Sequence, residues 1–210
     1  MIVGGGTMGR GIAQVFLQNR CPVILVELQE EVLASARQEI EKRLRRLEEK
    51  EKLPQGAAQQ CLDHLTCSTT VSGYSVHLVI EAIVEEMKAK KSLFQQLDEE
   101  MPIGTIIASN TSSLSISEMA SSISHPERVL GVHFFNPAPL MPLVEVIQGM
   151  ETNPVYIEQI QQMLLAFGKS PVVARDTPGF IVNRVARPFY NEALKIYADQ
   201  VATIEVIDHI

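Results

Sequence analysis

The sequence predicts an α/β protein with a doubly wound, mainly parallel β-sheet. Segments with strand-like and helix-like patterns alternate along the chain, which is typical of this class. Several strand segments are apolar throughout, as expected for strands that helices cover on both faces. The 210 residues are 46% hydrophobic and 20% charged, a composition typical of a globular protein that is long enough to bury a core.

The chain opens with an alternation of strand and helix around a glycine-rich loop. Residues 1–3 are apolar and are expected to form the first strand. Residues 7–19 carry apolar side chains at helical spacing, and residues 23–26 form a fully apolar run that predicts a buried parallel strand. Because a strand normally has about five or six residues, we expect a few residues to be missing in front of Met1.

A long charged segment follows and ends in a helix breaker. Residues 29–52 interleave acidic and basic side chains at helical spacing, which predicts an exposed helix. A Pro-Gln-Gly break at 54–56 ends it, and residues 57–63 are expected to form a short helix that returns antiparallel. The remaining strands are expected at 65–68, 77–82, 105–109, 129–135, 143–147 and 170–174, and the remaining helices at 86–100, 154–167 and 179–198. The serine-rich stretch 109–124 is expected to be a loop that leads into a short helix.

Charge and cysteine content narrow the possible functions. The net charge of −7 argues against nucleic acid as a partner, because phosphate binding requires a basic surface. No apolar run reaches the length of a membrane span, so no membrane partner is expected. The three cysteines and five histidines form no metal-ligand pattern, which predicts free thiols and no metal. Free thiols and the lack of a leader pattern predict a cytoplasmic protein.

The loop Gly4-Gly5-Gly6-Thr7-Met8-Gly9 matches the dinucleotide fingerprint GxGxxG of Rossmann-type domains. In that motif Gly4 permits the tight turn, Gly6 lets the backbone approach a pyrophosphate, and Gly9 lets the helix pack closely on the strand. Thr7 and Met8 stand at the start of the helix, whose amides and positive dipole end favour phosphate. These five residues are therefore the first candidates for cofactor binding.

An acidic residue at the end of the second strand completes this signature. Glu27 follows Gly9 by eighteen residues, where the motif expects a carboxylate that binds the adenine ribose. A carboxylate there repels a 2′-phosphate, so the sequence predicts NAD rather than NADP as the cofactor. A bare tight turn remains the alternative interpretation of the glycine cluster.

One histidine and one glutamate are candidates for acid–base chemistry. His133 ends an apolar strand just before a proline-rich loop, and doubly wound sheets place their sites at the carboxyl ends of strands. A histidine suits the transfer of a hydroxyl proton during oxidation of an alcohol by NAD. Glu145 lies within the next apolar strand, where a charge is costly unless it is partnered. Alternatively, His133 is structural and Glu145 faces solvent on an edge strand.

Several longer motifs make the chain resemble the L-3-hydroxyacyl-CoA dehydrogenase family, in particular its 3-hydroxybutyryl-CoA dehydrogenases. Besides the glycine loop, the resemblance rests on VIEAIVE (79–85), ASNTSSL (108–114), GVHFFNPAP (131–139), LVEVI (143–147) and DTPGFIVNR (176–184), in the family's order. It extends over essentially the whole chain. It implies reversible, NAD-dependent oxidation of a (3S)-3-hydroxyacyl-CoA, in fatty acid β-oxidation or related short-chain acyl-CoA metabolism.

The resemblance also assigns roles to matched positions. It implies that His133 is the catalytic base and Glu145 its partner, that Ser112 contacts the substrate oxygen, and that Asn183 helps to hold the reacting acyl group. Further matched positions lie toward the cofactor, namely Glu27 (where the family more usually has aspartate), Glu85 and Lys90, and Asn136 matches a position on the cofactor and substrate side beside the histidine. The helices at 29–52 and 57–63 resemble the family's helical-hairpin insertion over the CoA, and Arg43 and Lys50 match positions that face it.

The resemblance divides the chain into two parts. Residues 1–175 correspond to the NAD-binding domain, and residues 176–210 to the beginning of an all-helical domain that completes the substrate pocket and pairs subunits into a homodimer. Since the chain ends within a helical pattern, we expect this second domain to be truncated.

Two alternative functions stay open at this stage. The first is a dehydrogenase for a 3-hydroxy acid that carries no CoA, such as carnitine. The second is a non-catalytic NAD-binding protein on the same scaffold.

Overall fold

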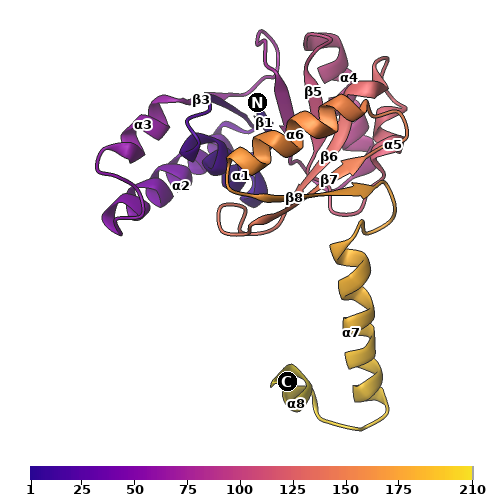
Figure 1. Cartoon of the computed structure of the whole chain (residues 1–210). Coiled ribbons are helices and arrows are strands. Elements are labelled where there is room, and N and C mark those ends of the chain that lie inside the picture. The colour runs from indigo at the N-terminus through magenta and orange to yellow at the C-terminus, as the bar shows by residue number, and fades with distance from the viewer. Residues whose placement is uncertain (210) are drawn as a thin grey trace.

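The computed structural model describes residues 1–209 and shows one eight-stranded sheet with the strand order β3-β2-β1-β4-β5-β6-β7-β8 (Figure 1). The strands are β1 (Ile2–Val3), β2 (Val23–Val26), β3 (Leu65–Ser68), β4 (Leu78–Glu81), β5 (Ile106–Ser109), β6 (Val129–Phe134), β7 (Leu143–Gln148) and β8 (Ser170–Arg175). The helices are α1 (Thr7–Gln18), α2 (Glu30–Glu49), α3 (Ala57–Asp63), α4 (Met87–Glu100), α5 (Ile116–Ala120), α6 (Pro154–Ala166), α7 (Val182–Ala198) and α8 (Ile204–His209), with a 3₁₀ turn at Pro126–Arg128.

The sheet is doubly wound and mainly parallel, which confirms the predicted fold class. From β1 the chain winds outward to β2 and β3, and then crosses back to β4, β5 and β6 on the other side. These six strands are parallel, so their carboxyl ends share one edge. The strand β7 runs antiparallel to β6, because the loop between them is too short for a crossover, and β8 is parallel to β7.

Helices bury both faces of the sheet, which explains the apolar strands. Ile80 packs with residues of α1, α2 and α6 in one buried cluster. Its neighbour Val79 packs with residues of α4 and α5 in a second cluster. Successive side chains of a strand point to opposite faces, so β4 must be apolar on both.

The predicted helical hairpin is present after β2 as α2 and α3, which pack together. Glu48, near the end of α2, accepts hydrogen bonds from the amides of Gly56 (2.6 Å) and Ala58 (3.0 Å) and so closes the connection. The expected helix over 29–52 ends earlier, at Glu49, because Glu51 takes a left-handed conformation with φ of 55°.

The helix α7 extends away from the sheet and carries α8 at its far end (Figure 1). It begins at Val182 rather than at the predicted residue 179, because Gly179 (φ 78°) and Phe180 (φ 48°) are left-handed and cannot belong to a helix. None of the residues of α7 is buried. Along residues 1–209, no helix combines the length and the apolar character needed to span a membrane. The three cysteines are free.

Candidate active site

The glycine loop connects β1 to α1 at the carboxyl edge of the sheet. A Cβ atom on Gly4 would lie 2.4 Å from the carbonyl oxygen of Ala82, and one on Gly9 would lie 1.8 Å from that of Gly4. Both positions therefore require glycine. In contrast, a Cβ atom on Gly6 would have no atom within 4 Å, so the loop leaves open space above Gly6. This arrangement fits the close approach of a pyrophosphate.

The groups around this open space suit a dinucleotide. No side chain caps the first turn of α1, which begins at Thr7 and Met8, so its amides remain available for an anion. Glu27, at the end of β2, accepts a hydrogen bond from the amide of Gly5 at 2.9 Å. A cleft of about 790 Å³ runs along this edge and is lined by residues of the loop, β2, the segments after β3 and β4, and α4, among them Gly4, Gly6, Glu27, Thr70, Ile83 and Gln96.

The structure brings His133 and Glu145 into direct contact. They stand opposite each other in the antiparallel register of β6 and β7. His133 Nδ1 donates to Glu145 Oε2 over 2.7 Å, and the two residues are 6% and 0% exposed. The other carboxylate oxygen, Oε1, accepts hydrogen bonds from the amides of Ile181 and Val182, each at 2.9 Å. Both oxygens of this buried carboxylate therefore accept hydrogen bonds, and the dipole of α7 favours its negative charge.

The pairing leaves His133 Nε2 as the ring nitrogen available for a reacting group. Among residues 1–209 no hydrogen-bond partner contacts Nε2. The rings of Phe135 and Phe180 lie 4.5 and 6.0 Å from the imidazole, centroid to centroid. These aromatic neighbours limit the access of water to the histidine.

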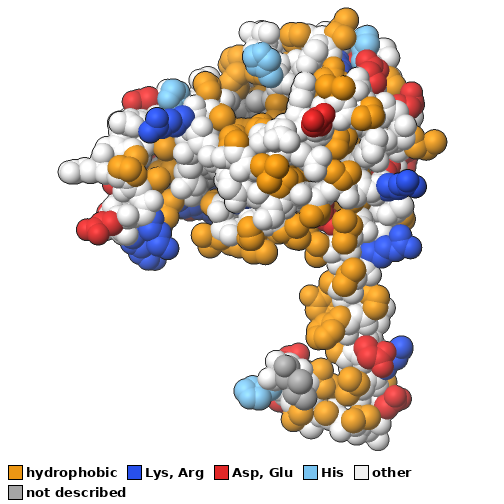
Figure 2. Space-filling model, viewed as in Figure 1, with side chains coloured by type: hydrophobic (Ala, Val, Ile, Leu, Met, Phe, Trp, Pro, Cys, Tyr) orange, Lys and Arg blue, Asp and Glu red, His pale blue; other side chains and the backbone are white. Residues whose placement is uncertain are grey.

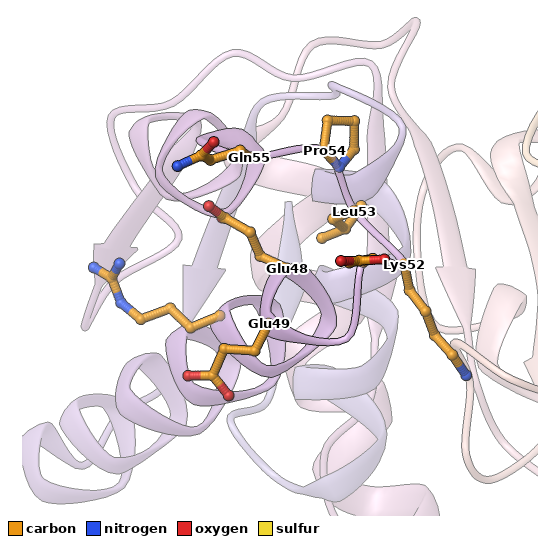
Figure 3. Close-up of a pocket in the computed structure, with 8 residues that line it drawn as sticks. Glu48, Glu49, Lys52, Leu53, Pro54 and Gln55 are labelled. Atoms are coloured by element: carbon orange, nitrogen blue, oxygen red, sulfur yellow. The ribbon is translucent and has the colours of Figure 1, made fainter.

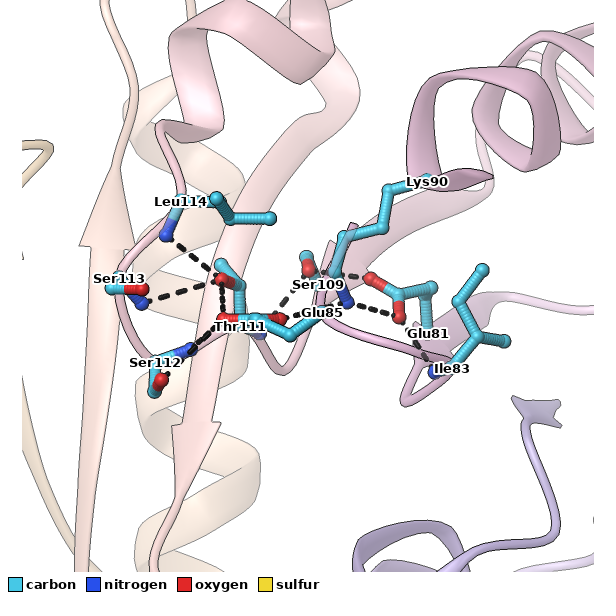
Figure 4. A network of polar contacts seen from close by, with 9 residues as sticks. All are labelled: Glu81, Ile83, Glu85, Lys90, Ser109, Thr111, Ser112, Ser113 and Leu114. Carbon is cyan, nitrogen blue, oxygen red and sulfur yellow. Dashed lines mark hydrogen bonds and ion pairs between the residues drawn. The ribbon is translucent and has the colours of Figure 1, made fainter. Parts of the chain in front are cut away.

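Ser112 and Asn183 also meet, although 71 positions separate them in the chain. Asn183, in the first turn of α7, donates from Nδ2 to the carbonyl oxygen of Ser112 at 3.0 Å. Ser112 also contacts Glu85, since the Ser112 amide donates a hydrogen bond to Glu85 Oε1 at 2.9 Å (Figure 4).

Glu85 belongs to a network of charges at the ends of β4 and β5 (Figure 4). Burial by itself would raise the pKa of Glu85, but hydrogen bonds from Thr111 Oγ1 and the Ser112 amide, together with the ammonium of Lys90, lower it below its usual value. Lys90 is 1% exposed and contacts Glu85 at 3.2 Å and Glu81 at 2.6 Å. Its assignment to the cofactor side stays a prediction.

Sequence reasoning missed the buried Glu81, which also accepts hydrogen bonds from Ser109 Oγ (2.6 Å) and the Ile83 amide (2.7 Å). The signal was available, because Glu81 ends an apolar strand just as Glu27 does. Asn110 was missed as well. Its side-chain oxygen accepts from the Phe134 amide at 2.9 Å and ties the end of β5 to β6.

Asn136 follows β6 and is exposed, and a cis peptide bond joins it to Pro137. Its predicted role on the cofactor and substrate side therefore rests on this position beside His133. No hydrogen bond of its side chain occurs among residues 1–209.

The structure does not bring Arg43 and Lys50 to the histidine. Both lie toward the end of α2, which packs on α1, α3 and β3 at the opposite end of the sheet from β6 (Figure 1). The adjacent pocket, at the tip of the hairpin, is lined by Arg45, Glu48, Glu49, Glu51, Lys52, Leu53, Pro54 and Gln55 (Figure 3). Three carboxylates in this lining make it a poor binding site for an anion.

The fold and the glycine-lined cleft together define a Rossmann-type dinucleotide-binding protein. The comparisons with known proteins go further. The model of the 3-hydroxyacyl-CoA dehydrogenase NAD-binding domain matches residues 1–177, and the model of the family's C-terminal domain matches residues 179–210. The chain therefore belongs to the 3-hydroxyacyl-CoA dehydrogenase family, and NAD is the cofactor of the domain it carries. Both the family and the cofactor predicted from the sequence are confirmed.

Named relatives match nearly the whole chain. The 3-hydroxyadipyl-CoA dehydrogenase of Escherichia coli K12 is 45% identical over 99% of this chain and 44% of its own length. A 3-hydroxybutyryl-CoA dehydrogenase of Clostridioides difficile is 41% identical over 99% of this chain and 74% of its own length. The crystal structure of a 3-hydroxybutyryl-CoA dehydrogenase from Escherichia coli K12 superimposes with a TM-score of 0.94 at 43% identity, and covers 98% of this chain and 44% of that one. The chain thus spans less than half of the first relative and about three quarters of the second.

Proposed function

We propose that this protein oxidises a (3S)-3-hydroxyacyl-CoA to the 3-oxoacyl-CoA with NAD+, and catalyses the reverse reaction. The observation that carries the proposal is the buried His133–Glu145 pair at the carboxyl edge of the sheet, 2.7 Å between Nδ1 and Oε2. The glycine-lined cleft opens at the same edge. A histidine held in this way has one nitrogen fixed and the other free for proton transfer.

His133 acts as the base in the oxidation. Because Nδ1–H donates to Glu145, Nε2 is unprotonated and takes the proton of the substrate hydroxyl. Glu145 then stabilises the imidazolium, and the amides of Ile181 and Val182 hold the other carboxylate oxygen in place. Bound NAD+ supplies the acceptor for the hydride that leaves the carbon. In the reduction, the Nε2–H of His133 returns its proton to the oxygen.

Ser112 and Asn183 position the substrate in this proposal. Both are partly buried, and their mutual hydrogen bond fixes α7 next to the turn that follows β5. The Ser112 hydroxyl lies 3.4 Å from Glu85 Oε1, a long and weak contact that it can exchange for the substrate oxygen. Arg43 and Lys50, which do not line the acidic pocket at the hairpin tip, contact the CoA in this proposal at a distance from the chemistry. Asn136 and Lys90 support the cofactor.

The direct test is reduction of acetoacetyl-CoA, followed through the consumption of NADH. His133→Ala should abolish turnover and leave the dissociation constant of NADH nearly unchanged, because the imidazole contacts only the reacting oxygen. His64→Ala is the matched control, since His64 is exposed at the end of α3. A large loss of NADH binding in His133→Ala, or retained turnover, contradicts the assigned role.

Competition by free CoA separates this proposal from a dehydrogenase for carnitine or another free hydroxy acid. Only an enzyme that binds the CoA moiety should be inhibited. Fatty acid β-oxidation, or a related short-chain acyl-CoA conversion, is the metabolic setting proposed for the reaction.

We also propose a homodimer formed through the helical part of the chain. Figure 2 shows apolar side chains along α7, and Val185, Phe189 and Leu194 are each more than 60% exposed. Such a face is costly in water unless a partner covers it. Sedimentation of the wild type and of Phe189→Glu tests this, and a wild-type monomer contradicts it. We also propose a cytoplasmic location, which the free thiols favour, and localisation of a tagged full-length protein tests it.

A further inference from the structure

Asp176 is a partly buried carboxylate that the proposed mechanism does not use. It lies in the connection between β8 and α7 and binds the first turn of α5. Its Oδ1 accepts from the Ile116 amide at 3.0 Å, while Oδ2 accepts from the Ser117 amide at 2.7 Å and from Ser115 Oγ at 2.8 Å. Three donors thus fix this end of the connection to the sheet domain.

The same connection touches the candidate active site further along the chain. We call residues 176–183 the strap. Within it, the ring of Phe180 faces His133, and the amides of Ile181 and Val182 donate to Glu145. Its last residue, Asn183, donates to the carbonyl oxygen of Ser112.

The strap therefore links the two separate parts of the site. Ser112 follows β5 and lies three residues before Ser115, where Asp176 is bound. His133 and Glu145 lie on β6 and β7. Through the strap, one segment contacts both the turn that carries Ser112 and the histidine–glutamate pair.

The strap contains a strained turn, which contacts on its near side and the burial of Phe180 stabilise. Gly179 and Phe180 are both left-handed, a conformation that is costly for the bulky Phe180 and persists only where surrounding contacts enforce it. On its far side the strap continues into α7, in which no residue is buried. On its near side the strap follows β8, and the Asp176 amide donates to the Gln148 carbonyl oxygen at 3.1 Å, while the Asp176 carboxylate adds the three bonds to the first turn of α5.

We propose that Asp176 is a positioning residue for the reaction. By binding the first turn of α5, it holds the strap so that the amides of Ile181 and Val182 stay on Glu145 and Asn183 stays on Ser112. It thereby sets the substrate-binding serine relative to the catalytic histidine without contacting either. The kinetic consequence rests on the proposed function, whereas the effect on the strap does not.

The test compares Asp176→Asn with Asp98→Asn in the whole chain. Asp98 is the matched control, because it also accepts hydrogen bonds from a backbone amide (Ser124) and from side chains, but contacts no part of the strap. Hydrogen exchange at the amides of Ile181 and Val182 reports on the strap. The rate constants for reduction of acetoacetyl-CoA and the dissociation constant of NADH report on the site.

In Asp176→Asn we expect exchange at these two amides to rise by roughly tenfold or more, since bonds to a charged acceptor are lost. We expect kcat to fall by a similar factor, with NADH binding within about twofold of wild type, because the glycine-lined cleft lies apart from the strap. Asp98→Asn should change neither quantity. Ser115→Ala, which removes one of the three donors, should give a smaller change in the same direction and serves if Asp176→Asn does not fold.

Three results would overturn the proposal. Unchanged exchange at Ile181 and Val182 would show that Asp176 does not hold the strap. An equal rise in Asp98→Asn would show a global loss of stability instead of a local one. Faster exchange with an unchanged kcat would show that the strap does not position the site. If the wild type itself lacks turnover, the proposed function fails, and the exchange data still decide whether Asp176 anchors the strap.

Discussion

Substitution of Glu145 by Gln changes the proton arrangement of the histidine with almost no change in shape. Glu145 Oε2 accepts from His133 Nδ1 at 2.7 Å, and Oε1 accepts from two amides at 2.9 Å. A glutamine satisfies the two amides only if its oxygen faces them, and its NH₂ group then points at Nδ1. Since this NH₂ group is a donor, Nδ1 has to accept, and the ring proton then sits on Nε2. That tautomer cannot act as a base through Nε2.

The size of the effect follows from this geometry. General acid–base catalysis by a positioned group contributes about 10²- to 10⁴-fold, and a wrong tautomer removes most of it. We expect kcat in Glu145→Gln to fall on the order of 10³-fold, which corresponds to about 4 kcal/mol in the activation free energy. The dissociation constant of NADH should stay close to that of the wild type, because Glu145 lies on β7, away from the glycine-lined cleft.

Single-turnover reduction of acetoacetyl-CoA measures the chemical step, and the nitrogen chemical shifts of His133 measure its tautomer without any substrate. Glu118→Gln is a suitable control, since Glu118 is exposed on α5. A folded Glu145→Gln protein that loses less than about tenfold in kcat would refute the proposed proton transfer. A His133 that keeps its proton on Nδ1 would refute the tautomer argument.

Three further outcomes follow from other parts of the structure. Gly9→Ala places a Cβ 1.8 Å from the Gly4 carbonyl, so NADH binding should fall by about 100-fold or more in titrations, whereas Gly104→Ala, with open space around its Cβ, should bind normally. Lys169→Met removes three hydrogen bonds to carbonyl oxygens of the loop between β6 and β7 and should lower the free energy of unfolding in urea by about 1–3 kcal/mol, and an unchanged midpoint would contradict this. Burial would raise the pKa of Asp176, but its hydrogen bonds lower it, so its folded pKa lies below the unfolded value of about 3.9. The stability lost in Asp176→Asn should be constant from neutral pH down to about 4 and shrink below it, and urea titrations that show the same difference at acid pH would argue against this charge effect.

The position of most elements could be predicted from the sequence because their patterns are local. Residues 57–63 are helical and residues 23–26 are a strand, as their spacing indicated. The errors occur at the ends of elements, and the largest of them, at the end of α2 and the start of α7, lie beside residues with positive φ. The helix after β8 starts at Val182 because Phe180 is left-handed, and nothing in its side chain signals that conformation.

In the candidate site, too, some residues could be predicted from the sequence and others depend on tertiary packing. An acid within an apolar strand, such as Glu145, requires a partner on energetic grounds, and the nearby His133 was a natural choice. The ion pair of Lys90 with Glu81 was not foreseen, because a lysine in a charged helix is most often exposed. Its burial depends on how α4 packs against the end of β4.

The sequence by itself determined the class of the sheet, the dinucleotide loop and the candidate residues for acid–base chemistry, because apolar periodicity and glycine spacing act over a few neighbouring residues. The tertiary structure alone decided the antiparallel register that sets His133 opposite Glu145. It also decided that Glu145 accepts hydrogen bonds from amides at the start of α7, and that Asp176 binds the strap to α5. These contacts join segments 12 to 61 positions apart, and such pairs are fixed by packing of the whole sheet and not by any local pattern.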